Sequence, residues 1–261
     1  MQVQFLGCGD AFGSGGRFNT CFHVASSSGR FLIDCGASSM IAMRRFGVDP
    51  NAISTVFLSH LHGDHFGGLP FFLLDAQFYS KRDEPLTIAG PPGTEDRLRD
   101  AMEIFFPGSN SVDRRFLTEF VEMAAGHRLE IGGVGVLPFD VAHDCGARPY
   151  ALRLEVDGRV LAYTGDSEWK ESLIEAGWEA DLLIAEALFF DKKIRWHLAY
   201  QSLCSNLDHI APKRLILTHL GPNMLARAGE VACEIAEDGM IIELDAAWSF
   251  HTLTTPKIFD G

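Results

Sequence analysis

The densest group of chemically capable side chains lies between residues 60 and 65, where three histidines and one aspartate occupy six positions. These residues are His60, His62, Asp64 and His65. Buried imidazoles need a partner, and a divalent metal ion is one that several neutral ring nitrogens can share. On an extended segment His60 and His62 point to one side, whereas Asp64 and His65 follow a turn toward a second position. The spacing therefore predicts a metal-binding loop.

Further candidate ligands follow apolar segments that are typical of buried strands. Each such segment ends just before one candidate: His60 after Thr55–Leu58, His143 after Val136–Val141, Asp166 after Val160–Tyr163 and His219 after Leu215–Leu217. Sites in α/β sheets gather at the carboxyl ends of strands, because a rigid strand positions the loop that follows. Taken alone, His143 or His219 would more often be a structural histidine, and Asp166 would be a turn residue. Their common placement favours one shared site.

The remaining sequence alternates strand and helix patterns in two strand-rich halves, with no Pro/Gly/Ser linker between them. The other expected strands are Val3–Leu6, Cys21–Ala25, Arg30–Asp34, Leu86–Ala89, Thr118–Glu122, Ala151–Val156 and Leu182–Ala185. The expected helices are Ala37–Phe46, Leu69–Tyr79, Glu95–Phe105 with Thr94 as N-cap, Glu168–Ala176 and Leu198–Leu207. Gly7–Gly13 has the wrong spacing for a dinucleotide-binding loop, and we expect a tight turn beside the active site. The pattern predicts one layered α/β domain over residues 1–261.

Composition restricts the partners and the compartment. The chain has 22 Lys+Arg against 35 Asp+Glu, a net charge of −13, which argues against a broad electrostatic grip on nucleic acid. No apolar run approaches the roughly 18 residues of a membrane span. The start of the chain lacks the features of a signal peptide, and the six cysteines include no CxxC pair. We therefore expect a cytoplasmic protein with no membrane partner.

These motifs together resemble the metallo-β-lactamase superfamily of hydrolases. The similarity is to its ribonuclease Z-like branch, which includes cyclic-phosphate phosphodiesterases, and it covers essentially the whole chain. It rests on Phe5–Gly9, Leu32–Gly36, the segment 60–65, His143, Asp166 and His219. The resemblance implies an α/β fold of the four-layer αββα sandwich type, with a two-metal site between its sheets.

The resemblance also implies a set of ligands for two divalent metal ions. One metal would be held by His60, His62 and His143, the other by Asp64, His65 and His219, with Asp166 bridging them. Asp34 would steady the histidine loop. Zinc is the default metal for this histidine-rich set, and the carboxylate-containing second position also accepts manganese or iron.

A second motif concerns proton transfer. Glu186-Ala-Leu-Phe is similar to a Glu-Ala-x-Phe motif of ribonuclease Z-like enzymes, and His197 lies 22 residues before His219. The resemblance implies that His197 is a general acid or phosphate-binding group oriented by Glu186, and a histidine can supply such a proton near neutral pH. We take Asp64, Glu186 and His197 as the catalytic candidates. The basic residues Lys192, Lys193 and Arg195 could meet substrate phosphate; a solvated loop with a capping histidine is the alternative.

The leading hypothesis is a phosphodiesterase in which a hydroxide held between two metals attacks phosphorus and His197 protonates the leaving oxygen. Only 22 residues separate His143 from Asp166, too few for the tRNA-gripping arm that ribonuclease Z proper carries there. We therefore expect a small phosphorylated substrate, cyclic phosphodiesters included, with no extended nucleic-acid surface, and a homodimer is allowed. The alternatives are hydrolysis of a lactone, thioester, amide or sulfate ester, a ribonuclease Z-type endonuclease, and a non-catalytic binding or redox protein.

Overall fold

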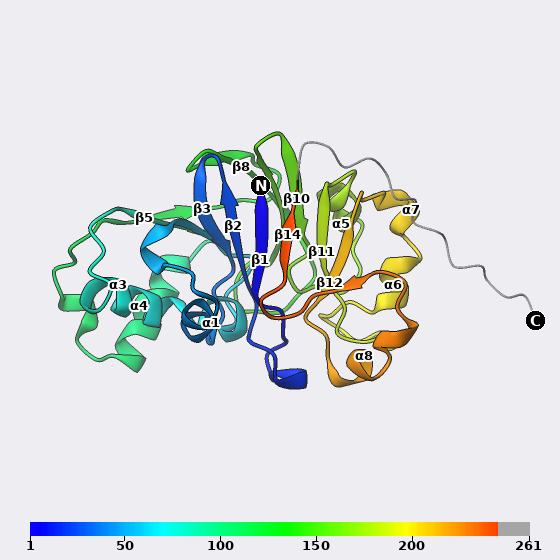
Figure 1. The fold of residues 1–261 in the computed structure, drawn as a ribbon, viewed down its shortest axis with the longest axis horizontal. Helices are drawn as coiled ribbons and strands as arrows, with labels where there is room; N and C mark the ends of the chain where they lie inside the picture. The colour runs from blue at the N-terminus through cyan, green and yellow to red at the C-terminus, as the bar shows by residue number, and fades with distance from the viewer. Residues whose placement is uncertain (245–261) are drawn as a thin grey trace, which may run out of the picture.

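Two seven-stranded sheets form the centre of the computed structural model, which describes residues 1–244 (Figure 1). The first sheet has the order β14 (Ile241–Glu243), β1 (Gln2–Gly7), β2 (Cys21–Ser26), β3 (Gly29–Ile33), β4 (Ile53–Phe57), β5 (Leu86–Gly90) and β6 (Thr118–Glu122). The second has the order β13 (Glu234–Ile235), β12 (Leu215–Thr218), β11 (Leu182–Glu186), β10 (Arg159–Tyr163), β9 (Tyr150–Val156), β8 (Val134–Asp140) and β7 (Leu129–Ile131).

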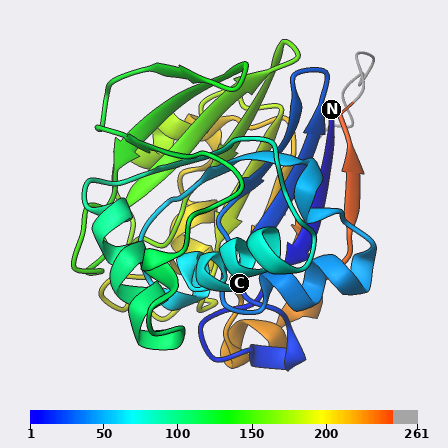
Figure 2. The ribbon, with the colours of Figure 1, turned by 90° about the vertical axis from the view of Figure 1, so that its left-hand side faces the viewer.

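Helices cover the outer faces of both sheets. Figure 1 shows α1, α3 and α4 on one side of the sheets and α5 to α8 on the other, and Figure 2 looks onto the first group. The helices on the first side are α1 (Ser39–Phe46), α3 (Leu69–Phe78) and α4 (Thr94–Phe105), with the single turn α2 (Gly63–Phe66) before α3. On the second side lie α5 (Ser172–Gly177), α6 (Tyr200–Cys204), α7 (Leu207–Ile210) and α8 (Pro222–Ala226). The expected αββα sandwich is confirmed.

Three apolar cores explain why four layers form. The central core joins the facing sides of the sheets, and it includes Phe31 and Ile33 of β3 together with Ile184 of β11. Leu32, between the two β3 residues, belongs instead to the core under α1, α3 and α4. A third core lies under the second group of helices. Because side chains alternate along a strand, strands buried on both faces become continuous apolar runs, which is the pattern seen in the sequence.

Strand direction brings the candidate site residues to one region. Strands β3 to β6 are parallel in the first sheet, and β10 to β13 are parallel in the second. The carboxyl ends of each parallel set therefore lie at one edge of its sheet, and the loops that follow them can converge. Strands β2 and β3 form an antiparallel hairpin, in which Ser26 pairs with Gly29.

Most expected elements are present, and the differences are local. Thr94 is the first residue of α4 and not its N-cap; the cap position is Gly93, and the Thr94 hydroxyl donates to the Pro91 carbonyl oxygen at 2.6 Å. The two helical stretches expected in the second half are shorter, as α5, α6 and α7. The short strands β7, β13 and β14 were not predicted.

Two further observations concern the chain as a whole. Among residues 1–244, no helix combines the length and the apolar character that crossing a membrane requires. The expectation of one domain over residues 1–261 extends past the described residues and stays a prediction.

Candidate metal centre

The loops after four strands bring the predicted ligands together. His60 follows β4, His143 follows β8, Asp166 follows β10 and His219 follows β12, as the strand patterns predicted. The predicted ligands form two groups, and within each group the possible ligand atoms lie within 4.8 Å of one another; a third such group joins Asp166 and His219 to Glu186 and His197. The first group is His60, His62 and His143, and the second is Asp64, His65, Asp166 and His219. The structure thus brings together all seven residues predicted from the sequence.

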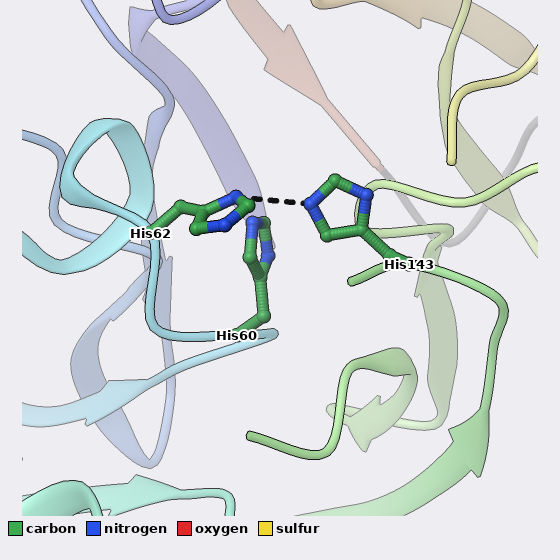
Figure 3. Close-up of side chains that lie close together, drawn as sticks. All are labelled: His60, His62 and His143. Carbon is green, nitrogen blue, oxygen red and sulfur yellow. Dashed lines mark hydrogen bonds between the residues drawn. The ribbon is translucent and has the colours of Figure 1, made fainter. Parts of the chain in front are cut away.

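The first group consists of three imidazoles that point toward one another (Figure 3). The ring centroids of His60 and His62 are 5.1 Å apart, and each lies 4.8 Å from that of His143. Nδ1 of His62 and Nε2 of His143 approach to 3.0 Å. Burial lowers the pKa of all three histidines, that of His60 most strongly, so neutral rings with a free lone pair are favoured. A neutral imidazole is the form that binds a metal.

A backbone contact fixes the orientation of His143. Its Nδ1 lies 2.7 Å from the Trp196 carbonyl oxygen, which can only accept, so Nδ1 carries the proton. Nε2 of His143 is then the nitrogen left with a lone pair, and it is the one that faces His62. Histidines that bind metals typically donate their other ring N–H to such an oxygen.

The second group places two carboxylates against two imidazoles. His65 Nε2 lies 3.3 Å from Asp64 Oδ2 and 3.4 Å from Asp166 Oδ1. His219 Nε2 lies 3.2 Å from the same Asp64 oxygen and 3.3 Å from Asp166 Oδ2. Asp166 Oδ2 is also 3.9 Å from His60 Nε2, so this carboxylate lies between the two groups.

Electrostatics in the second group favour bound positive charge. Burial alone would raise the pKa of both carboxyls, but His65 and His219 outweigh it and keep the pKa of Asp64 low and that of Asp166 well below its usual value. Burial likewise opposes charge on His219, yet Asp166 raises its pKa to about 9. Without a metal, the two carboxylates favour protonated histidines beside them. A divalent cation among these atoms would supply that positive charge instead.

Asp34 holds the histidine loop in place through three hydrogen bonds. This fully buried carboxylate accepts from the Ser59 backbone N–H at 2.8 Å and from the Ser59 hydroxyl at 2.7 Å. It also accepts from His65 Nδ1 at 2.7 Å, which leaves His65 Nε2 as the nitrogen directed at the acidic group. Asp34 thus has the supporting place expected of it. Sequence reasoning missed Ser59, although its position just before His60 could have drawn attention to it.

Buried atoms without partners test whether this donor set fits a metal. Among the described residues, His60 Nε2, His65 Nε2, Asp166 Oδ1 and His219 Nδ1 are buried and make no hydrogen bond. Buried polar atoms nearly always have a partner, and those that lack one need an explanation. Three of these four atoms face the interior of the two groups, where a divalent ion would satisfy them. The residues present therefore fit divalent metal binding.

His197 and Glu186 form a hydrogen-bonded pair beside Asp166. The fully buried Glu186 ends β11, and its Oε2 accepts from the backbone N–H groups of Ser167 at 2.8 Å and Leu198 at 3.3 Å. Its Oε1 accepts from His197 Nδ1. Burial opposes charge on His197, but the Glu186 carboxylate outweighs it and raises the pKa of the imidazole. The pair can hold a proton on an imidazole that lies 3.9 Å from Asp166 Oδ2.

Two residues of this centre have a strained backbone conformation. Asp34 and His219 both have positive φ, 58° and 59°, a conformation that non-glycine residues rarely adopt. The His219 backbone N–H donates to the Cys8 carbonyl oxygen at 2.9 Å, which places the Gly7–Gly13 turn beside the site, as expected. Strained residues of this kind persist where the surrounding structure holds them, and they are common at functional sites.

The basic cluster is exposed on the loop before His197. The Arg195 guanidinium lies 4.4 Å from the centroid of the Trp196 ring, and Lys192 lies 5.4 Å from that of Phe189. Lys193 lines a cavity that His197 also lines. Contact between these cations and substrate stays a prediction.

A family model matches residues 1–241 of this chain, and its description is "Anti-Pycsar protein Apyc1". The chain belongs to the Anti-Pycsar protein Apyc1 family. The match covers every residue of the two groups and the Glu186–His197 pair.

Individual relatives of this Apyc1-family chain agree with the expected resemblance. Ribonuclease Z of Halorubrum lacusprofundi is 27% identical over 308 residues, which cover 94% of this chain and 97% of that protein. The crystal structure of human tRNase Z, short form, has a TM-score of 0.73 and 26% identity over 94% of this chain and 100% of its own. The metallo-β-lactamase-fold protein YhfI of Bacillus subtilis has a TM-score of 0.73 and 21% identity, over 93% and 99%. The expected resemblance to ribonuclease Z-like proteins of the metallo-β-lactamase fold is confirmed.

One prediction from the sequence is wrong. We expected a small phosphorylated substrate and no extended nucleic-acid surface, whereas relatives aligned over nearly the whole chain are ribonucleases. The error came from relying on the short spacing between His143 and Asp166 and on the net charge, which sums over the entire surface and says little about one site. It also counts carboxylates of the centre, which bound cations would compensate: Asp34, Asp64, Asp166 and Glu186.

Proposed function

We propose that this chain is a binuclear metal-dependent phosphodiesterase. The observation that carries the proposal is the joint placement of two ligand groups around Asp166 with the Glu186–His197 pair beside them. The ribonuclease Z relatives support the same class of bond, because a ribonuclease cleaves phosphodiesters. The crystal structure of Zn(2+)-bound PqqB from Methylobacterium extorquens, which has a similar fold, supports a divalent metal for this fold.

Zinc at both positions is the metal content that we propose. His60, His62 and His143 would hold one ion, while Asp64, His65 and His219 would hold the other, with Asp166 between them. Histidine nitrogens with few carboxylates are typical of zinc sites, and the second group is also suited to manganese or iron. When bound, the two ions acidify water and neutralise charge that develops on the phosphoryl oxygens.

The protein groups around the ions have two tasks. Asp34 and the Trp196 carbonyl oxygen fix the tautomers of His65 and His143, so that each ring presents Nε2 to the centre. His197, held at Nδ1 by Glu186, has Nε2 left to donate a proton to the leaving oxygen. Expelling an alkoxide without a proton is costly, and general acid catalysis typically contributes about 10²–10⁴-fold.

An activity panel on protein of measured metal content tests this function. The substrates are bis(4-nitrophenyl) phosphate, a 3′,5′-cyclic nucleotide, a precursor tRNA, a lactone and a sulfate ester. We expect hydrolysis of phosphodiesters, and comparison of the cyclic nucleotide with the tRNA assigns the substrate class. Activity confined to the lactone or the sulfate ester would overturn the proposal, because the same ligand set can serve those bonds.

A further inference from the structure

A cavity of about 430 Å³ lies beside the centre, and it is lined by His197, Trp169, Lys193, Gln201, Ser202 and Asn206 among others. Its walls come from the segment after β10, the loop around His197, and α6 with the residues that follow it. None of the seven candidate metal ligands lines it, so His197 is the residue that the cavity and the centre share. Its volume is within the range of pockets that enclose small organic molecules.

The position of the cavity matches one part of a phosphodiester substrate. In an in-line displacement the leaving oxygen departs on the side of phosphorus opposite the attacking oxygen. His197 borders the centre through its contact with Asp166, and its ring is 5.1 Å from that of His143 between centroids. If His197 protonates the leaving oxygen, the organic group attached to that oxygen extends past His197. The cavity lies on that side of His197, where this organic group would be placed.

We propose that this cavity is a subsite for a nucleoside in the leaving group. The proposal rests on the phosphodiesterase function proposed above, and it specifies the chemistry of one side of the substrate. A nucleoside can belong to a cyclic nucleotide or to an RNA strand, and the cavity chemistry is the same for both.

The lining suits a nucleobase in two respects. Trp169 offers an indole surface, and stacking of a base on an aromatic side chain is tolerant of base identity. Gln201 has an exposed side-chain amide that makes no hydrogen bond within residues 1–244, so both its donor and acceptor are available for the edge of a base. Asn206 donates to the Ser202 carbonyl oxygen at 2.8 Å, which leaves its own amide oxygen able to accept.

Inhibition by free adenosine tests the subsite on the intact protein. We expect adenosine to inhibit hydrolysis of bis(4-nitrophenyl) phosphate competitively, and ribose alone to have no effect. Trp169→Leu retains apolar packing but removes the stacking surface, and it should weaken inhibition about 10-fold. Gln201→Ala changes an exposed side chain that makes no hydrogen bond within residues 1–244, and it should weaken inhibition about 3-fold. The control is Trp178→Leu, an exposed tryptophan outside the cavity, which should leave inhibition unchanged.

The same variants separate the possible outcomes. Equal inhibition constants in all variants, or no inhibition of the wild type, would overturn the subsite even if phosphodiesters are hydrolysed. If bis(4-nitrophenyl) phosphate is not hydrolysed, the proposed function fails, and calorimetric binding of adenosine to wild type and Trp169→Leu decides the cavity independently. Measuring kcat/KM for a 3′,5′-cyclic nucleotide and for a short oligoribonucleotide shows which of them supplies the nucleoside. Only the true substrate should be hydrolysed less efficiently by Trp169→Leu. If neither substrate is hydrolysed less efficiently, the proposal is overturned.

Discussion

Replacing Glu186 by glutamine separates proton donation from metal binding. Glutamine has nearly the same size, and its amide oxygen can still accept from the backbone N–H groups of Ser167 and Leu198. Its NH₂ group would then take the place of the oxygen that accepts from His197 Nδ1. The imidazole therefore loses its carboxylate partner. Of the seven candidate ligands, His219 also faces this carboxylate, with its Nδ1 3.7 Å from Glu186 Oε1, but it makes no hydrogen bond to it.

The expected loss follows from the hydrogen bond that is removed. The amide NH₂ cannot accept from a protonated Nδ1, so the imidazolium loses its bond to the carboxylate, and a bond to a charged group contributes about 1.5–3 kcal/mol. That corresponds to a rate decrease of roughly 10–150-fold where protonation of the leaving group limits the reaction. The pKa of His197 also falls without the carboxylate that raises it. Because the acid must be protonated, the loss of activity with rising pH should begin at lower pH in Glu186→Gln.

The assay compares two substrates that need the acid to different degrees. We measure kcat/KM against pH for a 3′,5′-cyclic nucleotide, whose leaving alkoxide is strongly basic, and for bis(4-nitrophenyl) phosphate, whose leaving phenolate is weakly basic. The decrease should be confined to the cyclic nucleotide, with the metal content unchanged; the control is Glu119→Gln, an exposed glutamate of β6. An equal decrease with both substrates, or an unshifted pH profile, would refute the assigned role of the pair.

Three further substitutions make separate predictions. Asp34→Asn removes the charge that holds His65, and zinc affinity measured against a chelating dye should fall about 10–100-fold; unchanged affinity would contradict the supporting role. Asp166→Asn removes the carboxylate between the two groups, and elemental analysis should find fewer metal ions per chain than in the wild type, whereas equal content would count against a shared ligand. Burial, with a smaller effect of Arg30, lowers the pKa of His23 to about 4, so from pH 6.5 down to about 4 the unfolded chain binds a proton that the folded chain does not. The free energy of unfolding, measured by denaturant titration, should fall by up to about 3 kcal/mol over that window. It should fall less in His23→Leu. The same pH dependence in both proteins would refute this role of His23.

The layered fold could be predicted because most of its strands are buried on both faces. Segments such as Leu182–Ala185 are short apolar runs, and such runs between turn residues predict buried strands without reference to the rest of the chain. Strand β14 could not be found in this way. Its three residues have an intermittent burial pattern, and the strand forms because it pairs with the edge of β1.

The candidate site was predictable to the extent that its members have chemically distinctive side chains. His143 and His219 could be grouped with residues 60–65 because each follows an apolar strand. The Trp196 carbonyl oxygen that orients His143 has no signature in the sequence, since every residue carries a carbonyl. Likewise, the cavity beside His197 arises from three segments that only the folded chain brings together.

The central claim is that residues of the two groups hold two divalent metal ions, and metal stoichiometry tests it most directly. The protein is equilibrated with excess zinc, freed of unbound metal and measured by elemental mass spectrometry against a protein concentration from amino-acid analysis. The account predicts two zinc ions per chain, with the first group emptied selectively in His62→Ala, because His62 belongs to that group alone. No bound zinc in the wild type, or two ions per chain in His62→Ala as well, would contradict it.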